Sequence, residues 1–233
     1  MIEIIKRAIR KLVFNNPTLS YSQAGEDVLI FYLLSDIGIR NIKYLDIGTN
    51  KPINGNNTYL FYTKGNSGVL VEADPSLIPS LKNHRKRDKI LNIGVAVSEE
   101  KEMEFYKFNE PAINTFNKEE ALKRDKQGLH KIVSTVKIPL ISINELIKNN
   151  FESYPDFISI DIEGLDLEVL KSIDIKKYPI PIICVETCQY STNHIRPKDL
   201  SIGEFMKSIG YFAYGDTYIN TIFVNENWFK SKM

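Results

Sequence analysis

The sequence lacks the features that mark several specialised classes of protein. Only two of its 233 residues are cysteines, Cys184 and Cys188. Four positions apart in one extended run, they would lie about 13 Å from each other, which is too far for a disulfide. Both are therefore predicted to be free thiols in a cytoplasmic protein. Lys and Arg total 30 against 29 for Asp and Glu, and this balance gives no electrostatic reason to expect nucleic acid as a partner.

A long apolar run is also missing, because no stretch approaches the roughly 20 residues that a membrane-spanning helix needs. Residues 1–16 combine a basic and an apolar stripe without a long uncharged core, so they do not resemble a signal peptide. We expect an amphipathic helical extension that packs against the domain or a neighbouring subunit, or that lies peripherally on the inner face of an anionic membrane. Residues 17–233 are expected to form a single domain.

What the chain does contain is an alternation of short apolar strands and helical patterns. The last two apolar runs, 211–214 and 219–224, are joined by a short turn, so the last strand should be antiparallel to its neighbours. The pattern as a whole predicts an α/β fold with a mostly parallel sheet and helices on both faces. The other strands are predicted over residues 42–48, 67–71, 90–97, 102–108, 136–140, 156–163 and 180–186.

Three segments carry more local expectations. Ser22 is predicted to cap a helix that ends near Gly38. The basic run over residues 82–87 is expected to be a solvated face. Residues 109–135 are polar, with a short helical pattern around 119–126, and are predicted to form an irregular insertion over the site.

Acidic side chains stand at the ends of several predicted strands. In a parallel sheet ligands bind beyond the carboxyl ends of the strands, so these residues are the candidates for a site. Strict alternation over 156–163 would place Asp161 and Glu163 on the same face. Two like charges side by side are unfavourable unless a cation, hydrogen-bond donors or a retained proton compensates them. The full set is Asp46, Glu72, Asp161, Glu163 and Glu186.

The loop after the first strand favours a cationic ligand over a dinucleotide. It runs from Asp46 to Pro52 with one glycine, whereas a dinucleotide site needs several glycines so that the backbone can approach the pyrophosphate. A phosphate would be repelled by Asp46, and a sulfonium would be attracted. S-adenosylmethionine is such a ligand, and Glu72 stands where an acceptor for its ribose hydroxyls is expected.

Six motifs follow one another along the sequence: YSQAGED (21–27), YLDIG (44–48), NTYLFY (57–62), GVLVE (68–72), IDIEG (160–164) and VET (185–187). They resemble, in this order, the motifs of the FkbM-type family of S-adenosylmethionine-dependent methyltransferases. The resemblance runs from about residue 21 to about residue 224. It implies a class I methyltransferase fold, and O-methylation of a hydroxyl on a saccharide or sugar-containing acceptor of the surface-polysaccharide or natural-product type. Many members follow the glycine of the acidic motif with histidine, but here Leu165 stands there, so no histidine base is expected at that position.

The resemblance also implies roles for individual residues. Glu72 would hold the ribose, Ala96 and Val97 would lie near the adenine, and Asp161 would face the transferred methyl group. The residues expected to contact the cofactor are Gln23, Glu26, Asp46, Gly48, Asn50, Asn57, Thr58, Glu72, Ala73, Asp74, Ala96 and Val97.

Asp161 is the first candidate for a general base, and Glu163 is the second catalytic candidate. Together with Glu186 they could form an all-oxygen site for a divalent cation such as Mg²⁺. Glu163 has an alternative role as an acid that complements the dipole of the following helix. Two alternatives to a methyltransferase stay open at this point. One is a non-catalytic relative that keeps the cofactor pocket within a larger assembly, and the other is a nucleotide-sugar oxidoreductase on a similar sheet.

Overall fold

The computed structural model describes residues 18–188 and 197–233. The predicted N-terminal extension over residues 1–16 lies outside these residues, so its membrane or subunit contact stays a prediction. None of the helices in the described part of the chain has the length and apolar character needed to span a bilayer.

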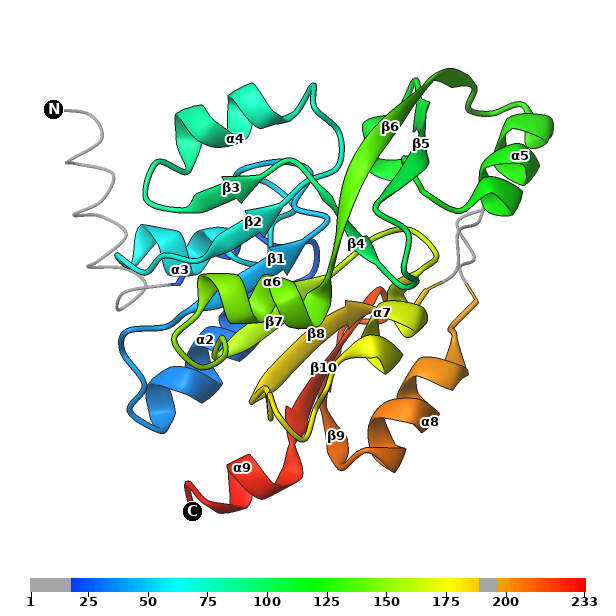
Figure 1. The fold of residues 1–233 in the computed structure, drawn as a ribbon. Coiled ribbons are helices and arrows are strands. Elements are labelled where there is room, and N and C mark those ends of the chain that lie inside the picture. The colour runs from blue at the N-terminus through cyan, green and yellow to red at the C-terminus, as the bar shows by residue number, and fades with distance from the viewer. Residues whose placement is uncertain (1–17, 189–196) are drawn as a thin grey trace, which may run out of the picture.

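Within the described residues the central sheet has seven strands, and their order explains where a ligand can bind (Figure 1). They are β1 (Tyr44–Ile47), β2 (Val69–Val71), β3 (Lys89–Leu91), β7 (Phe157–Ile160), β8 (Ile182–Glu186), β9 (Tyr211–Asp216) and β10 (Asn220–Asn225). The order across the sheet is β3-β2-β1-β7-β8-β10-β9. The first five strands in this order are parallel, and β10 is antiparallel to both β8 and β9. The predicted mostly parallel sheet with an antiparallel final strand is confirmed.

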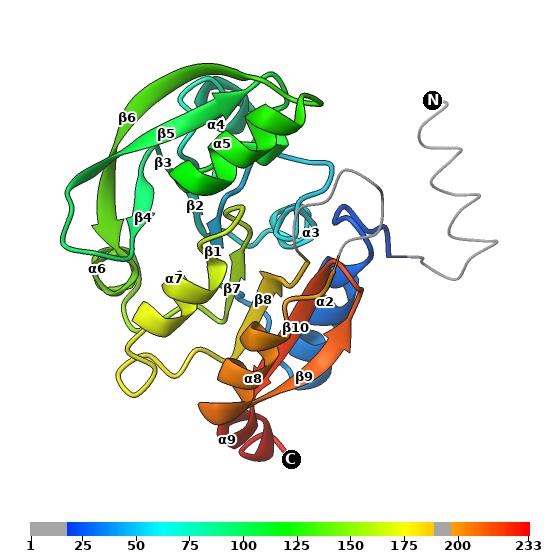
Figure 2. The same cartoon turned by 90° about the vertical axis from the view of Figure 1, so that its right-hand side faces the viewer.

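Helices cover both faces of this sheet, as predicted (Figures 1 and 2). On one face lie α2 (Glu26–Asp36), α3 (Tyr59–Thr63), α4 (Ile78–His84) and α9 (Glu226–Lys230), and on the other lie α6 (Ile143–Asn150), α7 (Asp166–Ser172) and α8 (Leu200–Ser208). Successive residues of the strands serve the two faces in turn, so Leu45 and Ile47 pack with α6 and α7 while Tyr44 packs with α2 and α3. Both faces are therefore apolar, as a parallel sheet requires.

A smaller sheet of three strands stands beside the main one. Its order is β4 (Gly94–Ala96), β6 (Ile132–Ser142) and β5 (Glu102–Phe108). The strand predicted over 90–97 is thus two strands in different sheets. At this break the Nδ2 of Asn92 donates to the carbonyls of Glu72 and Ala73 at 2.8 and 3.0 Å, so a side chain holds the segment between β3 and β4 against the end of β2.

The segment 109–135 is more regular than expected. It contains a short 3-10 helix (Pro111–Ile113), α5 (Lys118–Gln127) and the first residues of β6. The helical pattern predicted around 119–126 is confirmed as α5. Its N-cap is Asn117, whose side chain accepts a hydrogen bond from the backbone N–H of Glu120 at 3.0 Å.

One predicted helix start is wrong. Ser22 does not cap α2, which begins at Glu26 after Gly25, a residue with a left-handed φ of 99°. The Ser22 hydroxyl lies before the N-cap position, where it accepts hydrogen bonds from the backbone N–H of Gly25 at 3.0 Å and from that of Asp27, in the first turn of α2, at 3.4 Å. By contrast, Ser142 caps α6 as its position suggests, accepting from the N–H of Glu145.

Candidate active site

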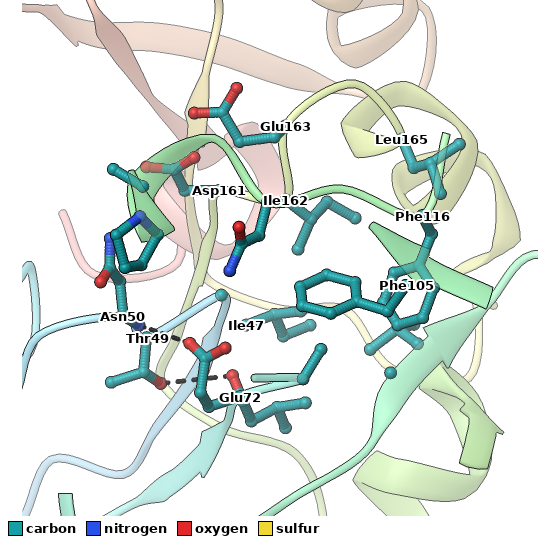
Figure 3. A pocket seen from close by; sticks show the side chains of 18 of the residues that line it. Ile47, Thr49, Asn50, Glu72, Phe105, Phe116, Asp161, Ile162, Glu163 and Leu165 are labelled. Atoms are coloured by element: carbon teal, nitrogen blue, oxygen red, sulfur yellow. Dashed lines mark hydrogen bonds between the residues drawn. The ribbon is translucent and has the colours of Figure 1, made fainter. Parts of the chain in front are cut away.

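A pocket lies beyond the carboxyl ends of β1, β2 and β7 (Figure 3). The residues that follow these three strands supply one part of its wall, with Gly48 to Asn50 after β1, Glu72 and Ala73 after β2, and Asp161 to Glu163 after β7. Figure 3 shows Glu72 at one end of the pocket, with Asp161 and Glu163 toward the other. The strand order predicts this location, because ligands bind at the carboxyl edge of such a sheet.

The remaining wall is apolar and comes from the smaller sheet and the segment after it. Ile93 and Val95 line the pocket from the β4 region, Phe105 lines it from β5, and Phe116 lies just before α5. The rings of Phe105 and Phe116 are 4.7 Å apart between centroids and inclined by 49°. They stand along one side of the pocket in Figure 3. This wall suits a flat apolar group such as a nucleobase.

Some of the residues predicted to contact a cofactor line this pocket, and others lie behind its wall. Gln23, Gly48, Asn50, Glu72 and Ala73 line it, as do the catalytic candidates Asp161 and Glu163. The predicted residues that are not part of the lining are Glu26, Asp46, Asn57, Thr58, Asp74, Ala96 and Val97.

Gly48 is required by the close approach of two chain segments. Its φ is 82°, and a Cβ atom on this residue would lie 1.8 Å from the carbonyl oxygen of Asp161. Only glycine combines the left-handed backbone with this absence of a side chain. The glycine thus lets the loop after β1 pass directly against the end of β7, which brings both parts of the pocket together.

Glu72 is the buried carboxylate of the pocket. It accepts hydrogen bonds from the backbone N–H groups of Asn50 and Asp74, each at 2.7 Å. Burial opposes its ionisation more than these donors favour it, and the pKa of Glu72 rises from its ordinary 4.5 to about 7. A carboxylate offers about four lone-pair positions, so it can accept further hydrogen bonds from a ligand that carries two neighbouring hydroxyls.

Asp46 is a structural residue here. It is buried, and its Oδ2 accepts hydrogen bonds from Thr58 Oγ1 at 2.8 Å and from Asn56 Nδ2 at 3.1 Å. Burial raises its pKa, although these donors and the nearby Arg85 act in the opposite direction. Asp46 and Thr58 therefore hold the loop between β1 and α3 behind the pocket lining, and their predicted contact with the cofactor stays a prediction.

Arg85 completes the same network and corrects a second prediction. The run over residues 82–87 was expected to be solvated, but Arg85 is fully buried. Its guanidinium donates to Asp88 at 2.7 Å, Thr58 at 2.9 Å and Asn56 at 3.0 Å, as well as to the Pro52 carbonyl and the Tyr44 hydroxyl. All five N–H groups are thus used, which is the condition for burying this cation without a large penalty.

The other predicted residues outside the lining have identifiable contacts. Glu26 accepts hydrogen bonds from Thr217 Oγ1 at 2.6 Å and Asn220 Nδ2 at 3.0 Å, so it joins α2 to the hairpin of β9 and β10. Asn57 donates to Ser159 on β7. Asp74 pairs with Lys107 and Asn114 of the smaller sheet and its extension. Ala96 lies within β4, and the exposed Val97 follows it. The preceding residues Ile93 to Val95 line the pocket.

Asp161, Glu163 and Glu186 are brought together, although not by the predicted strand register. β7 ends at Ile160, and Glu163 has a left-handed φ of 56°. The loop is held instead by Asp166, whose carboxylate accepts the backbone N–H groups of Ile162 at 3.1 Å and Gly164 at 3.2 Å. One oxygen from each of the three acids lies within 4.8 Å of the others.

A buried cation accompanies these acids. The Nη2 of Arg124, on α5, lies 3.0 Å from Glu163 Oε2, and its Nε lies 3.2 Å from Glu120. Arg124 therefore offsets part of the repulsion among the three carboxylates. Its position in a polar, charged helix gives no sequence signal for this role, whereas Phe105 could have been suspected from the alternation of its strand.

The sheet order and the site define a methyltransferase of class I. The comparison of sequences then identifies the family. Residues 46–213, most of the chain, match the model of the Methyltransferase FkbM domain. The chain therefore belongs to the FkbM family of S-adenosylmethionine-dependent methyltransferases. None of the curated proteins matches it.

Solved structures with low sequence identity resemble the chain over most of its length. One is the O-methyltransferase from Bacillus cereus in complex with SAH, at 14% identity and a TM-score of 0.42, covering 96% of this chain and 98% of that chain. Another is a putative caffeoyl-CoA O-methyltransferase from Staphylococcus aureus, at 12% identity and a TM-score of 0.46, covering 96% of this chain and 91% of that chain.

The residues of the pocket fit S-adenosylmethionine. Glu72 can accept hydrogen bonds from the ribose hydroxyls, and the wall formed by Ala73, Val95, Phe105 and Phe116 can receive the adenine. Within the described part of the chain, the buried Oδ1 of Asn50 has no hydrogen-bond partner. A donor on a ligand would satisfy this oxygen, which otherwise carries the cost of an unpaired buried acceptor.

Proposed function

We propose that the protein is an O-methyltransferase that transfers a methyl group from S-adenosylmethionine to a hydroxyl of a saccharide or sugar-containing acceptor. The observation that carries this proposal is the approach of Asp161 and Glu163 to the cofactor pocket from the end of β7, away from Glu72 (Figure 3). The saccharide is the acceptor class that the family resemblance implies. The family match favours this function over the oxidoreductase considered from the sequence.

When bound, S-adenosylmethionine supplies a methyl group activated by a sulfonium sulfur. The protein's main contribution is then to align the acceptor oxygen with that carbon and to exclude water. An alcohol is a weak nucleophile, so Asp161 would accept the hydroxyl proton as the oxygen displaces the sulfur from the methyl carbon, and S-adenosylhomocysteine would be the leaving group. Arg124 and Asp166 act indirectly, because they hold Glu163 and its loop in place.

A divalent cation at Asp161, Glu163 and Glu186 is a further part of the proposal. The mutual distances of up to 4.8 Å between their oxygens suit a shared ion. Arg124 already lies 3.0 Å from Glu163, so an ion bound by all three acids must compete with a guanidinium. In that case Mg²⁺ would polarise the acceptor hydroxyl. Asp161 would then be a ligand of the ion and would also lie next to the hydroxyl proton.

The test is methyl transfer by the purified protein to a panel of glycans, followed by release of S-adenosylhomocysteine. Asp161→Asn should lower turnover by about 10²–10⁴-fold, the usual contribution of a general base, while calorimetry shows cofactor affinity within a few fold of the wild type. Asp36→Asn, at the exposed end of α2, is the matched control. Full activity of Asp161→Asn would sink the assignment.

The same assay separates the remaining alternatives. Loss of activity in EDTA with recovery in Mg²⁺ supports the cation, and unchanged activity in EDTA rejects it. A non-catalytic relative would bind S-adenosylmethionine but release no S-adenosylhomocysteine with any acceptor. Binding of nicotinamide dinucleotides without binding of S-adenosylmethionine would overturn the proposal as a whole.

A further inference from the structure

A second pocket lies next to the cofactor pocket and is lined by residues on or beside α5, α7 and α8. We call it the acidic pocket, after the six acids that line it. Two cations, Lys123 and Arg124, also line it, and Leu167 and Ile202 are its aliphatic side chains. The six acids are Glu120, Glu163, Asp166, Glu168, Glu186 and Asp199.

The acidic pocket meets the cofactor pocket at the catalytic candidates. Among the described residues, Glu163 is the one that lines both pockets, whereas Asp161 lines the cofactor pocket and Glu186 lines the acidic pocket. Because oxygens of these three residues lie within 4.8 Å of one another, the two pockets are separated by little more than a layer of carboxylates. A hydroxyl that enters from the acidic pocket reaches the carboxylates that face the cofactor pocket.

The charges of the acidic pocket limit what it can hold. Arg124 is almost fully buried and is paired with Glu163 and Glu120, and Lys123 lies 3.3 Å from Glu120. Both cations therefore already pair with the protein's own acids, and among the described lining residues the acids outnumber the cations by six to two. A phosphate or carboxylate on a ligand would be repelled, whereas ionised carboxylates accept hydrogen bonds from hydroxyl groups.

We propose that the acidic pocket is the acceptor site and that the sugar unit it binds carries neither phosphate nor carboxylate. The inference rests on the proposed function and narrows its substrate class to uncharged sugars at the methylated unit. Several hydroxyls of such a sugar would donate to the carboxylates, and Leu167 and Ile202 would contact the C–H faces of its ring. The hydroxyl nearest Glu163 would receive the methyl group.

The first experiment measures binding and needs no turnover. Protein loaded with S-adenosylhomocysteine is examined by saturation-transfer NMR with a panel of neutral methyl hexopyranosides, each beside its uronate. We expect saturation-transfer signals from one or more neutral glycosides. The matching uronate should give little or no signal under the same conditions. Equal binding of the uronates, or no binding of any neutral glycoside at millimolar concentration, would overturn the proposal.

Two variants test the location. Leu167→Trp should fill the pocket and abolish glycoside binding, whereas Leu122→Trp, an exposed leucine of α5 that is not part of the lining, should leave it unchanged. Glu168→Lys reverses a charge at an exposed lining residue and should raise the binding of uronates relative to neutral glycosides several-fold. Glu119→Lys, exposed on α5 and outside the lining, is its control.

The outcomes distinguish this inference from the function on which it rests. Methyl transfer that persists undiminished in Leu167→Trp would place the acceptor elsewhere and leave the methyltransferase function standing. Neutral glycosides that bind in the acidic pocket without ever being methylated would support the pocket and contradict the proposed transfer.

Discussion

The buried carboxylate of Glu72 lowers the folding stability of the protein and provides a hydrogen-bond acceptor in the pocket. Its pKa in the folded protein is about 7, above its ordinary 4.5, so the folded state binds the proton more tightly than the unfolded state. The sign of the linkage follows: folding stability falls as the pH rises from about 4.5 to about 7, by about 3 kcal/mol for this shift. The buried carboxylate is therefore unfavourable for the free protein and available to a ligand.

This pKa predicts that binding of S-adenosylmethionine releases a proton. At pH 7 about half of the Glu72 side chains are protonated in the free protein, and ribose hydroxyls that donate to the carboxylate favour its ionised form. Calorimetry in two buffers of different ionisation enthalpy should measure a release of about half a proton per site. Glu72→Gln should bind more weakly and lose this release; an equal release in both proteins would contradict the role of Glu72.

At the residue scale, the sequence predicted some parts of the site better than others. Glu72 and Asp161 were identifiable because an acid that closes a buried strand of a parallel sheet must lie at the binding edge. Arg85 was not, since its burial depends on Tyr44, Asn56 and Thr58, which are distant in the sequence. A charged residue within a basic run shows no local sign of such partners.

At the scale of elements, the contact between the loop after β1 and the end of β7 depends on the missing side chain of Gly48. Gly48→Ala should lower the free energy of unfolding by more than the roughly 1–2 kcal/mol of a left-handed alanine, because its Cβ would lie 1.8 Å from the Asp161 oxygen. Gly38→Ala is a close control, with a φ of 83° and no atom within 4 Å of the added Cβ. Equal losses in urea denaturation would show that the close approach costs nothing.

The elements themselves were largely predictable, and their ends were not. Apolar alternation located β5 and the α5 pattern correctly, because each has a clear period. The residues 158–163 alternate as well, yet β7 stops at Ile160 since Asp166 binds the following backbone N–H groups and turns the chain. Where 90–97 divides into β3 and β4, the side chain of Asn92 likewise bonds to the backbone after β2, a contact that no sequence period reveals.

At the scale of the whole molecule, one ion pair joins the main sheet to the smaller one. Lys107 of β5 lies 2.7 Å from the buried carboxylate of Asp74, beyond the end of β2. Burial opposes the ionisation of Asp74, but the donors Lys107 and Ser76 outweigh it and hold its pKa below 3.8. The ion pair of Asp74 therefore stabilises the folded protein above the ordinary pKa of an aspartate, and this stabilisation is lost as the pH falls below that pKa.

Lys107→Met should destabilise the protein at neutral pH by about 1.5–3 kcal/mol, the range for hydrogen bonds to charged groups. The difference from the wild type should shrink as the pH falls below about 4, where Asp74 becomes protonated. Lys137→Met removes a pair of the same 2.7 Å length between β5 and β6, but both partners are exposed to solvent, so this change should destabilise the protein much less than Lys107→Met. Thermal unfolding over a pH series measures both; equal effects would contradict a special role for the link between the sheets.

The buried guanidinium of Arg85 also sets an order of events during synthesis of the chain. Four of its five hydrogen bonds reach back to Tyr44, Pro52, Asn56 and Thr58, which precede it by 27 to 41 residues. The loop after β1 therefore cannot take its final form until α4 has left the ribosome, a delay on the order of seconds at about 5–20 residues per second. β1 is therefore synthesised early, but the loop that follows it at the binding edge of the sheet reaches its final structure only later.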